Sequence, residues 1–253
     1  MEGALLTGKT ALVTGAAGAI GSAVALRLAQ AGADVALNHF RTPEPAEALA
    51  RAIRALGRKA LIVEADIGDE PQVEAMFAAV DRGFARLDIL VNNAGIARTE
   101  DIFSTTLEHW NEVIRANLTG PFLCCRAAML RMRAQGGGRI VNMGSVVGHQ
   151  GALKGHAPYG ASKAGLHGLT RTLARTGAPL GITVNAVAPG IVDTPMLMNT
   201  HGEAGIAGLK RLVPLNSLIR PDEVAEAVLY LCGDAARMIT GAVLDINGGM
   251  MMR

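Results

Sequence analysis

Apolar runs of strand length alternate with amphipathic helical windows along the whole chain, and this alternation constrains the fold more than any other feature of the sequence. Such alternation is typical of strand–helix units that build a parallel sheet with helices on both faces. Seven strand-like runs occur, at residues 10–14, 34–38, 60–64, 182–188 and 242–246, with two more that begin at residues 88 and 138. The pattern predicts an α/β protein with one doubly wound domain over residues 1–253 and a mostly parallel, seven-stranded sheet.

The first strand-like run leads into a glycine-containing turn, Gly15-Ala16-Ala17-Gly18-Ala19-Ile20-Gly21. Apolar residues at Ile20, Val24 and Leu28 then recur with helical spacing, and Gly32 marks the end of that helix. A turn of small residues between a strand and a helix brings backbone N–H groups close to a diphosphate. We therefore predict a dinucleotide site here. Its expected contacts are Gly15, Gly18, Ala19, Ile20 and Gly21.

The tip of the second strand reads Asn38-His39-Phe40-Arg41 and carries no acidic residue. A carboxylate at this position would bind the ribose 2′-hydroxyl of NAD, whereas an arginine can bind the 2′-phosphate of NADP. The sequence therefore favours NADP(H) over NAD(H), although NAD(H) stays open. Arg41 is either the phosphate ligand or a solvated loop residue.

Polar residues follow three other predicted strands, and each of these residues has two possible roles. Asp66, with Ile67 beside it, either meets the adenine amino group or caps the following turn. Asn92 and Asn93 lie at the end of a buried strand and either lock the sheet, which we favour, or touch a ligand. Thr194 either hydrogen-bonds the nicotinamide carboxamide or caps a helix.

Tyr159 and Lys163 lie four residues apart in a helix-forming segment, so their side chains share one face. An ammonium beside a phenol lowers the pKa of the phenol, which makes Tyr159 a candidate general acid/base. Ser145 ends the strand-like run before this helix and is placed to hold a substrate oxygen. Asn117, in a helical region predicted from Leu107 to Ala134, is either a buried structural pin or part of a water chain.

The charge, the cysteines and the absence of targeting patterns indicate which partners and which cellular location to expect. The net charge is +2 and 18% of residues are charged, with both signs interspersed, which argues against nucleic acid as the main partner. The three cysteines, Cys124, Cys125 and Cys232, lack metal-ligand spacing and are expected to be reduced and buried. With no signal-peptide pattern at the start and no unbroken apolar span, we expect a soluble, cytoplasmic protein.

Taken together, these motifs resemble the short-chain dehydrogenase/reductase family from Leu6 to Gly249. The resemblance implies a tetrad in which Tyr159 moves the proton, Ser145 holds the oxygen, Lys163 binds the nicotinamide ribose and Asn117 fixes a relay water. It implies hydride transfer to or from nicotinamide without a metal, and a homotetramer. The further cofactor contacts that it implies are Asn93, Ala94, Gly95, Pro189, Gly190 and Val192, together with Tyr159 and Lys163.

The sequence also departs from the family pattern. Ala19 stands where the turn usually has its middle glycine, and one methyl group there should be tolerated. Members that reduce 3-oxoacyl groups on an acyl carrier protein usually have arginines where this chain has Gly136 and Leu180, although Arg131 or Arg133 are candidate substitutes. A 3-oxoacyl-[acyl-carrier-protein] reductase is therefore one alternative, beside an NAD-dependent sugar or alcohol dehydrogenase.

Our leading hypothesis is an oxidoreductase that transfers hydride between NADP(H) and a carbonyl or secondary alcohol. A dinucleotide-binding scaffold without catalysis is the alternative outside the enzymes. Residues of about 190–220 are expected to form an irregular, mobile lid over an apolar substrate pocket. His149 and His156 flank that pocket, and we expect loop residues there more than substrate contacts.

Overall fold

The computed structural model describes residues 5–152 and 155–252, and a sheet of seven parallel strands runs through its centre. The strands are ordered β3-β2-β1-β4-β5-β6-β7, so the direction of winding reverses between β1 and β4. This confirms the predicted fold class and the number of strands. The strands are β1 (Thr10–Val13), β2 (Asp34–His39), β3 (Ala60–Glu64), β4 (Ile89–Asn92), β5 (Gly138–Met143), β6 (Ile182–Pro189) and β7 (Val243–Ile246).

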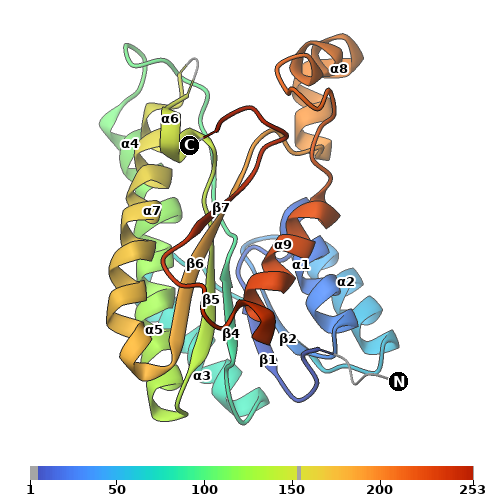
Figure 1. The fold of residues 1–253 in the computed structure, drawn as a ribbon, viewed down its shortest axis with the longest axis vertical. Helices are drawn as coiled ribbons and strands as arrows, with labels where there is room; N and C mark the ends of the chain where they lie inside the picture. The colour runs from blue at the N-terminus through green and yellow to red at the C-terminus, as the bar shows by residue number, and fades with distance from the viewer. Residues whose placement is uncertain (1–4, 153–154, 253) are drawn as a thin grey trace.

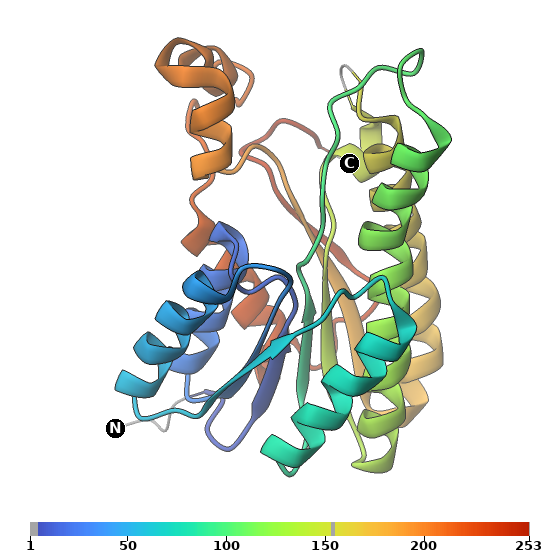
Figure 2. The same ribbon diagram turned by 180° about the vertical axis from the view of Figure 1, so that it is seen from behind.

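Helices cover both faces of the sheet (Figure 1). One layer holds α1 (Ala19–Gln30), α2 (Pro43–Ala55) and α9 (Pro221–Cys232). The other layer holds α3 (Glu70–Gly83), α4 (Leu107–Ile114), α5 (Gly120–Ala134) and α7 (Ala157–Gly177), as the reverse view in Figure 2 also shows. Within the described residues, no helix combines the length and the apolar character needed to span a membrane.

The interior strands are apolar on both sides because each side meets a helix layer. Leu12 and Val13, adjacent in β1, are both fully buried but belong to different apolar clusters, one on each side of the sheet. This alternation follows from the two-residue period of a strand. The two clusters account for the continuous apolar runs that the sequence displays.

The helical region from 107 to 134 is interrupted by one turn of π-helix, Arg115–Thr119. The helical region predicted from 107 to 134 is therefore present, and the π-turn within it is a feature that the sequence analysis did not anticipate. The π-turn contains Asn117, which is completely buried. Such a turn changes the direction of a single side chain within an otherwise regular helix, and it occurs often at functional sites.

Helix α8 (Pro195–Lys210) extends beyond the carboxyl ends of the strands, away from the rest of the molecule (Figures 1 and 2). We predicted an irregular segment here, and the structure instead has a helix. Thr194 accepts a hydrogen bond from the Leu197 N–H group at 3.3 Å, and Pro195 occupies the first turn. These two features start a helix despite the mixed composition that follows.

Candidate active site

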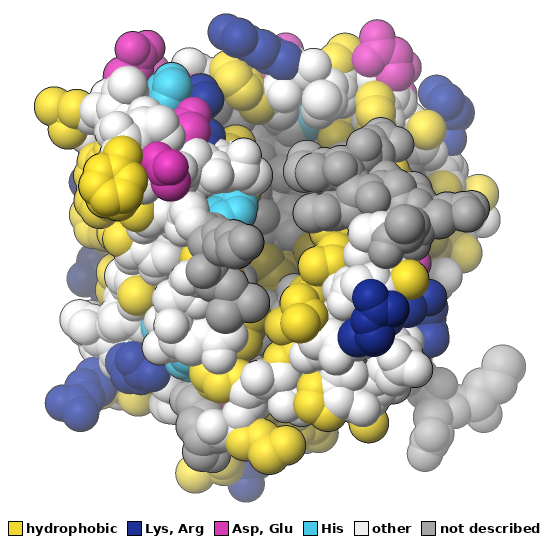
Figure 3. Space-filling model, turned by 90° about the horizontal axis from the view of Figure 1, so that it is seen from above, with side chains coloured by type: hydrophobic (Ala, Val, Ile, Leu, Met, Phe, Trp, Pro, Cys, Tyr) yellow, Lys and Arg dark blue, Asp and Glu magenta, His cyan; other side chains and the backbone are white. Residues whose placement is uncertain are grey.

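A cleft of about 760 Å³ runs along the carboxyl edge of the sheet, over the point where the winding reverses. Figure 3, which looks onto this edge, shows a hollow near its centre with hydrophobic side chains around it. In open α/β sheets such a crevice is the expected position of a ligand. Predicted residues that line the cleft are Gly15, Gly18, Ala19, Ile20, Gly21, Asp66, Ile67, Asn93, Ala94, Gly95 and Thr194.

The glycine turn packs too tightly for larger residues at two positions. A Cβ atom on Gly21 would lie 2.3 Å from the carbonyl oxygen of Gly15 and 2.6 Å from Nδ2 of Asn93. Gly15 has a φ of 61°, and a Cβ there would lie 2.8 Å from Cα of Ala94. Ala19, in contrast, is accommodated as the first residue of α1.

The start of α1 fits a phosphate group. Its N-cap is Gly18, which offers no side chain to the free N–H groups of the first turn, and no acidic residue lies in that turn. These N–H donors and the positive end of the helix face the cleft, where an anion would satisfy them. The residues that are present therefore fit the diphosphate of a dinucleotide.

Two asparagines from neighbouring strands hold the turn in place. Asn38 accepts a hydrogen bond from the Gly15 N–H group at 3.1 Å. Asn93 donates to the carbonyl oxygens of Thr14 and Gly15, both at 3.0 Å. Our sequence analysis did not assign a role to Asn38, although a buried asparagine at a strand tip was the available signal.

Asn92 has the sheet-locking role that the sequence favoured for the asparagine pair. Its Nδ2 donates to Oδ1 of Asn142 on the adjacent strand β5 at 2.9 Å, and both residues are buried. Asn142 in turn donates to the Thr170 hydroxyl of α7 at 2.9 Å. This chain of hydrogen bonds ties β4 and β5 to α7.

The tip of β2 contributes His39, Phe40 and Thr42 to the cleft, but Arg41 is not among the lining residues. Arg41 has a φ of 58°, and its guanidinium group lies over the Phe40 ring at 4.7 Å from the ring centroid. Its backbone N–H group donates to the carboxylate of Glu64 at 3.3 Å. The sequence analysis found no carboxylate near this tip because Glu64 comes from the next strand, β3.

Asp66 and Thr194 have the structural roles that were open alternatives, and both also line the cleft. Asp66 accepts a hydrogen bond from the Gly68 N–H group at 2.9 Å and pairs with Arg115 at 2.8 Å. Thr194 caps α8, as described above. Pro189, Gly190 and Val192 lie at or just beyond the end of β6 but outside the lining of the cleft.

The hydroxyl of Ser145 is hydrogen-bonded to the side chain of Tyr159. Ser145 also accepts a hydrogen bond from the Val147 N–H group at 3.2 Å, which orients its side chain at the end of β5. Strand β5 and helix α7 thus bring two hydroxyl groups together, as the sequence predicted. A substrate oxygen between these hydroxyls would meet two hydrogen-bonding groups.

Lys163 lies one turn after Tyr159 and is only 4% exposed. Its Nζ donates to the carbonyl oxygen of Met143 at 2.6 Å and lies 5.5 Å from the centroid of the Tyr159 ring. Burial lowers the pKa of Lys163 to about 8. Removal of the ammonium from water disfavours its charged form.

The pKa of Tyr159 differs from our expectation. The sequence predicted a lowered pKa, but burial of the phenol raises it, and the hydrogen bond from Ser145 only partly opposes this effect. The Lys163 ammonium contacts the Met143 carbonyl group, and its own charge is disfavoured by burial. Desolvation therefore outweighs the hydrogen bond from Ser145 and sets the direction in which the pKa of the phenol shifts.

Asn117 connects these residues to the cleft. Its Nδ2 donates to the Ile96 carbonyl oxygen at 2.8 Å and to the Ser162 hydroxyl at 3.2 Å, and its Oδ1 accepts from the Ile96 N–H group at 2.8 Å. A Cβ atom on Gly95 would lie 3.0 Å from Oδ1 of Asn117 and 3.8 Å from Nζ of Lys163. Gly95, which lines the cleft, therefore lies next to Asn117 and Lys163.

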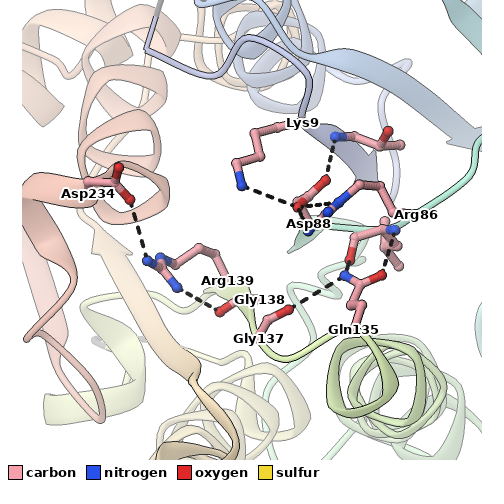
Figure 4. A network of polar contacts seen from close by, with 10 residues as sticks. Lys9, Arg86, Asp88, Gln135, Gly137, Gly138, Arg139 and Asp234 are labelled. Atoms are coloured by element: carbon pink, nitrogen blue, oxygen red, sulfur yellow. Dashed lines mark hydrogen bonds and ion pairs between the residues drawn. The ribbon is translucent and has the colours of Figure 1, made fainter.

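A second cavity, of about 290 Å³, lies at the opposite, amino edge of the sheet (Figure 4). Asp88, with a side chain only 7% exposed, pairs there with Arg86 at 2.6 Å and Lys9 at 3.5 Å and accepts from the Thr10 N–H group at 3.0 Å. Arg139 lies 3.7 Å from the fully exposed Asp234. The contacts of Asp88 connect the starts of β1 and β4, the separate Arg139–Asp234 pair lies at β5, and we assign both a structural role.

Comparisons with known proteins agree with this geometry. A family model described as enoyl-(acyl carrier protein) reductase matches residues 15–251. A 3-oxoacyl-[acyl-carrier-protein] reductase from Synechocystis sp. is 42% identical, and the match covers 98% of both chains. A cis-4-hydroxycyclohexanecarboxylate dehydrogenase from Sinomonas cyclohexanicum is also 42% identical, over 95% of this chain and 96% of its own.

Among solved structures, a protein from Sinorhizobium meliloti 1021 assigned as a short-chain alcohol dehydrogenase has a TM-score of 0.92 at 36% identity. That match covers 97% of each chain. Fold, cleft and sequence identity therefore agree over nearly the whole length of the protein. The chain belongs to the short-chain dehydrogenase/reductase family.

Proposed function

We propose that this oxidoreductase transfers hydride between NADP(H) and a carbonyl or secondary alcohol, with Tyr159 as the general acid/base. One observation supports this proposal most strongly. The side chains of Ser145 and Tyr159 contact each other next to Lys163, which in turn lies beside Gly95 in the lining of the cleft. The nicotinamide would supply or accept the hydride. The protein would supply the proton and fix the orientation of the reacting carbon.

In the direction of reduction, a carbonyl oxygen accepts hydrogen bonds from Ser145 and Tyr159. As negative charge develops on that oxygen, the phenol donates its proton to it. Lys163 stands one turn away and favours the resulting phenolate by its charge. Asn117 holds the Gly95–Ile96 segment against Lys163 through both backbone groups of Ile96.

The Tyr159→Phe variant tests this assignment. Loss of the proton donor should lower kcat for a ketone by about 10²- to 10⁴-fold, the usual contribution of general acid catalysis. Tyr230→Phe is the matched control, because Tyr230 is the only other tyrosine of the chain and lies half-exposed on α9. Full activity of the Tyr159→Phe variant would remove Tyr159 from the proposed role.

The proposal also specifies that the enzyme prefers NADPH over NADH. His39, Phe40 and Thr42 line the cleft, and the flexible, exposed side chain of Arg41 lies between them in sequence. Arg41→Ala should weaken NADPH binding about 10-fold, as expected for one charge-assisted hydrogen bond, and NADH binding much less. Calorimetric titration with both cofactors measures the difference. Equal weakening would exclude Arg41 from the 2′-phosphate site.

The substrate class has several candidates. The Synechocystis and Sinomonas relatives are named for a 3-oxoacyl group and for a hydroxycyclohexanecarboxylate. Arg131, a candidate for carrier-protein docking, is bound to Asp81 through two hydrogen bonds and stacks over Phe77. This favours a small free carbonyl compound over a carrier-bound one, with 3-oxoacyl-[acyl-carrier-protein] as the second candidate. Reduction assays with a free and a carrier-bound 3-oxoacyl substrate separate the two.

The proposal also covers the oligomeric state and the cellular location of the enzyme. Phe122 and Leu130 on α5 are 43% and 55% exposed, which supports a homotetramer that pairs α5 and α7 between subunits. Light scattering of wild type and Leu130→Glu tests this, since the charge should break the assembly. A cytoplasmic enzyme whose segment 190–220 covers the substrate fits the three buried free thiols and the position of α8.

A further inference from the structure

His156 has a left-handed backbone conformation, with φ 59° and ψ 26°, immediately before α7. In the described part of the chain only Arg41 and Asn216 share a positive φ among residues other than glycine. This conformation is unfavourable for a histidine, and residues held in it occur often at ligand sites. His156 is three residues before Tyr159, so the first turn of α7 places both side chains at one end of the helix.

The neighbouring backbone enforces this conformation. The N–H group of His156 donates to the Glu100 carbonyl oxygen at 3.0 Å, and its own carbonyl oxygen accepts from Gly160 at 2.9 Å. A Cβ atom on Gly155 would lie 2.7 Å from the Thr99 carbonyl oxygen. The segment is therefore closely packed, and the direction in which the imidazole leaves the backbone is fixed.

The imidazole of His156 lies against the proposed proton donor. The centroids of the His156 and Tyr159 rings are 6.3 Å apart, and the ring planes are inclined at 64°. Nδ1 of His156 is buried and has no hydrogen-bond partner among the residues described in the structure. The Glu100 carboxylate pairs through Oε1 with His109 at 3.0 Å and with Arg98 at 3.5 Å, while its buried Oε2 has no hydrogen-bond partner among the described residues. In the part of the chain that the structure describes, Nδ1 of this ring beside Tyr159 is thus left for a ligand.

We propose that His156 is a specificity-determining residue that donates a hydrogen bond to a second oxygen of the substrate, close to the reacting carbonyl. The centroids of the two rings are 6.3 Å apart, a span that a compound with two oxygens on nearby carbons can bridge. The chemical class is an acyl oxygen one methylene from the ketone, as in a 3-oxo acid or a 3-oxo ester. The inference rests on the proposed carbonyl chemistry at Tyr159.

Three variants distinguish the contribution of the imidazole ring from that of the left-handed backbone at position 156. His156→Gly removes the ring but suits the left-handed backbone, so a purely structural role predicts no harm from it. His156→Phe keeps an aromatic ring without hydrogen-bonding atoms. His156→Asn also tolerates the left-handed conformation and restores an amide donor.

The assay compares kcat/KM for acetoacetate and methyl acetoacetate with that for hexan-2-one, which lacks the acyl oxygen. The ratio of acyl substrate to hexan-2-one should fall about 10-fold in both His156→Gly and His156→Phe and recover in part in His156→Asn. If the ratio falls only for acetoacetate, the group that His156 recognises is a carboxylate. If it falls for both acetoacetate and methyl acetoacetate, His156 recognises an acyl oxygen in general. Calorimetric affinities in the Tyr159→Phe background should follow the same order without turnover.

An unchanged ratio in His156→Gly would overturn the inference, even if His156→Phe were impaired, because only the turn would then matter. An equal loss on all three ketones would overturn it as well. Absence of any ketone reduction by the wild-type enzyme would instead refute the proposed function on which the inference rests. The two failures are thus distinguishable in one set of measurements.

Discussion

Replacement of Lys163 by methionine should make the protein more stable and inactive. Because burial lowers the lysine pKa from 10.5 to about 8, keeping the ammonium in the folded protein costs about 3 kcal/mol at neutral pH, at about 1.4 kcal/mol per pKa unit. Methionine has a similar length and no charge. The Met143 carbonyl group loses its donor in the variant, which costs about 1 kcal/mol. The expected net gain in the free energy of unfolding is about 1–3 kcal/mol.

The pH dependence identifies the cause of this gain. Below pH 8 the lysine is protonated in both folded and unfolded chains, so the wild type bears the full cost of the buried charge. Between pH 8 and 10.5 the folded protein releases the proton while the unfolded chain keeps it, so the stability of the wild type rises with pH. The advantage of Lys163→Met should therefore shrink by about 2 kcal/mol between pH 7 and pH 9.5.

Urea unfolding of both proteins without cofactor, at equal concentration and at the two pH values, measures this change. Lys59→Met serves as the control, because Lys59 is an exposed lysine at the start of β3. A stability difference that is the same at pH 7 and pH 9.5 would refute the argument that burial disfavours the ammonium. Retained activity of Lys163→Met would contradict the role proposed for this lysine.

Two further substitutions test the cleft and the amino edge of the sheet. Gly21→Ala should weaken NADPH binding at least 10-fold in calorimetry, because the new methyl group would collide with Gly15 and Asn93. Gly168→Ala is the control: Gly168 has open space around it, so this variant should bind NADPH normally. Asp88→Asn should lower the free energy of unfolding by about 1–2 kcal/mol in urea, since Arg86 and Lys9 lose a buried partner but are themselves half-exposed to water. Asp234→Asn, at a fully exposed position, should unfold like the wild type. If Gly21→Ala bound NADPH normally, or if both aspartate variants behaved alike, the corresponding contact would not matter.

The fold was predictable from the sequence because each strand contains a run of apolar residues and is followed by a turn or a helix. Asp69 illustrates the local signals: it precedes an apolar helical pattern and caps α3, where it accepts a hydrogen bond from the Gln72 N–H group at 3.0 Å. The Gln72 side chain does not complete a capping box with Asp69, since it accepts from the Asp66 N–H group at 2.9 Å. Sequence spacing does not encode which of these two backbone groups the Gln72 side chain reaches.

The candidate site was less predictable where it depends on contacts between distant segments. The π-turn at Asn117 brings this residue to Ile96 and Ser162, and periodicity along one helix carries no trace of either partner. The carboxylate of Glu64 reaches the Arg41 backbone only because β3 pairs with β2. The pKa of Tyr159 was predicted with the wrong sign, since the sequence gives the distance to Lys163 but not the extent of burial.

This last difference bears on the direction in which the resting enzyme is prepared to act. Burial raises the pKa of Tyr159 and lowers that of Lys163, so both effects favour the uncharged form of the group. A neutral phenol is the form that donates a proton to a carbonyl oxygen, while oxidation of an alcohol requires the phenolate as a base. In the protein alone the phenol is therefore in the state that reduction requires. For oxidation of an alcohol, the charge of Lys163, whose Nζ lies 5.5 Å from the centroid of the Tyr159 ring, would favour the phenolate and so oppose the effect of burial.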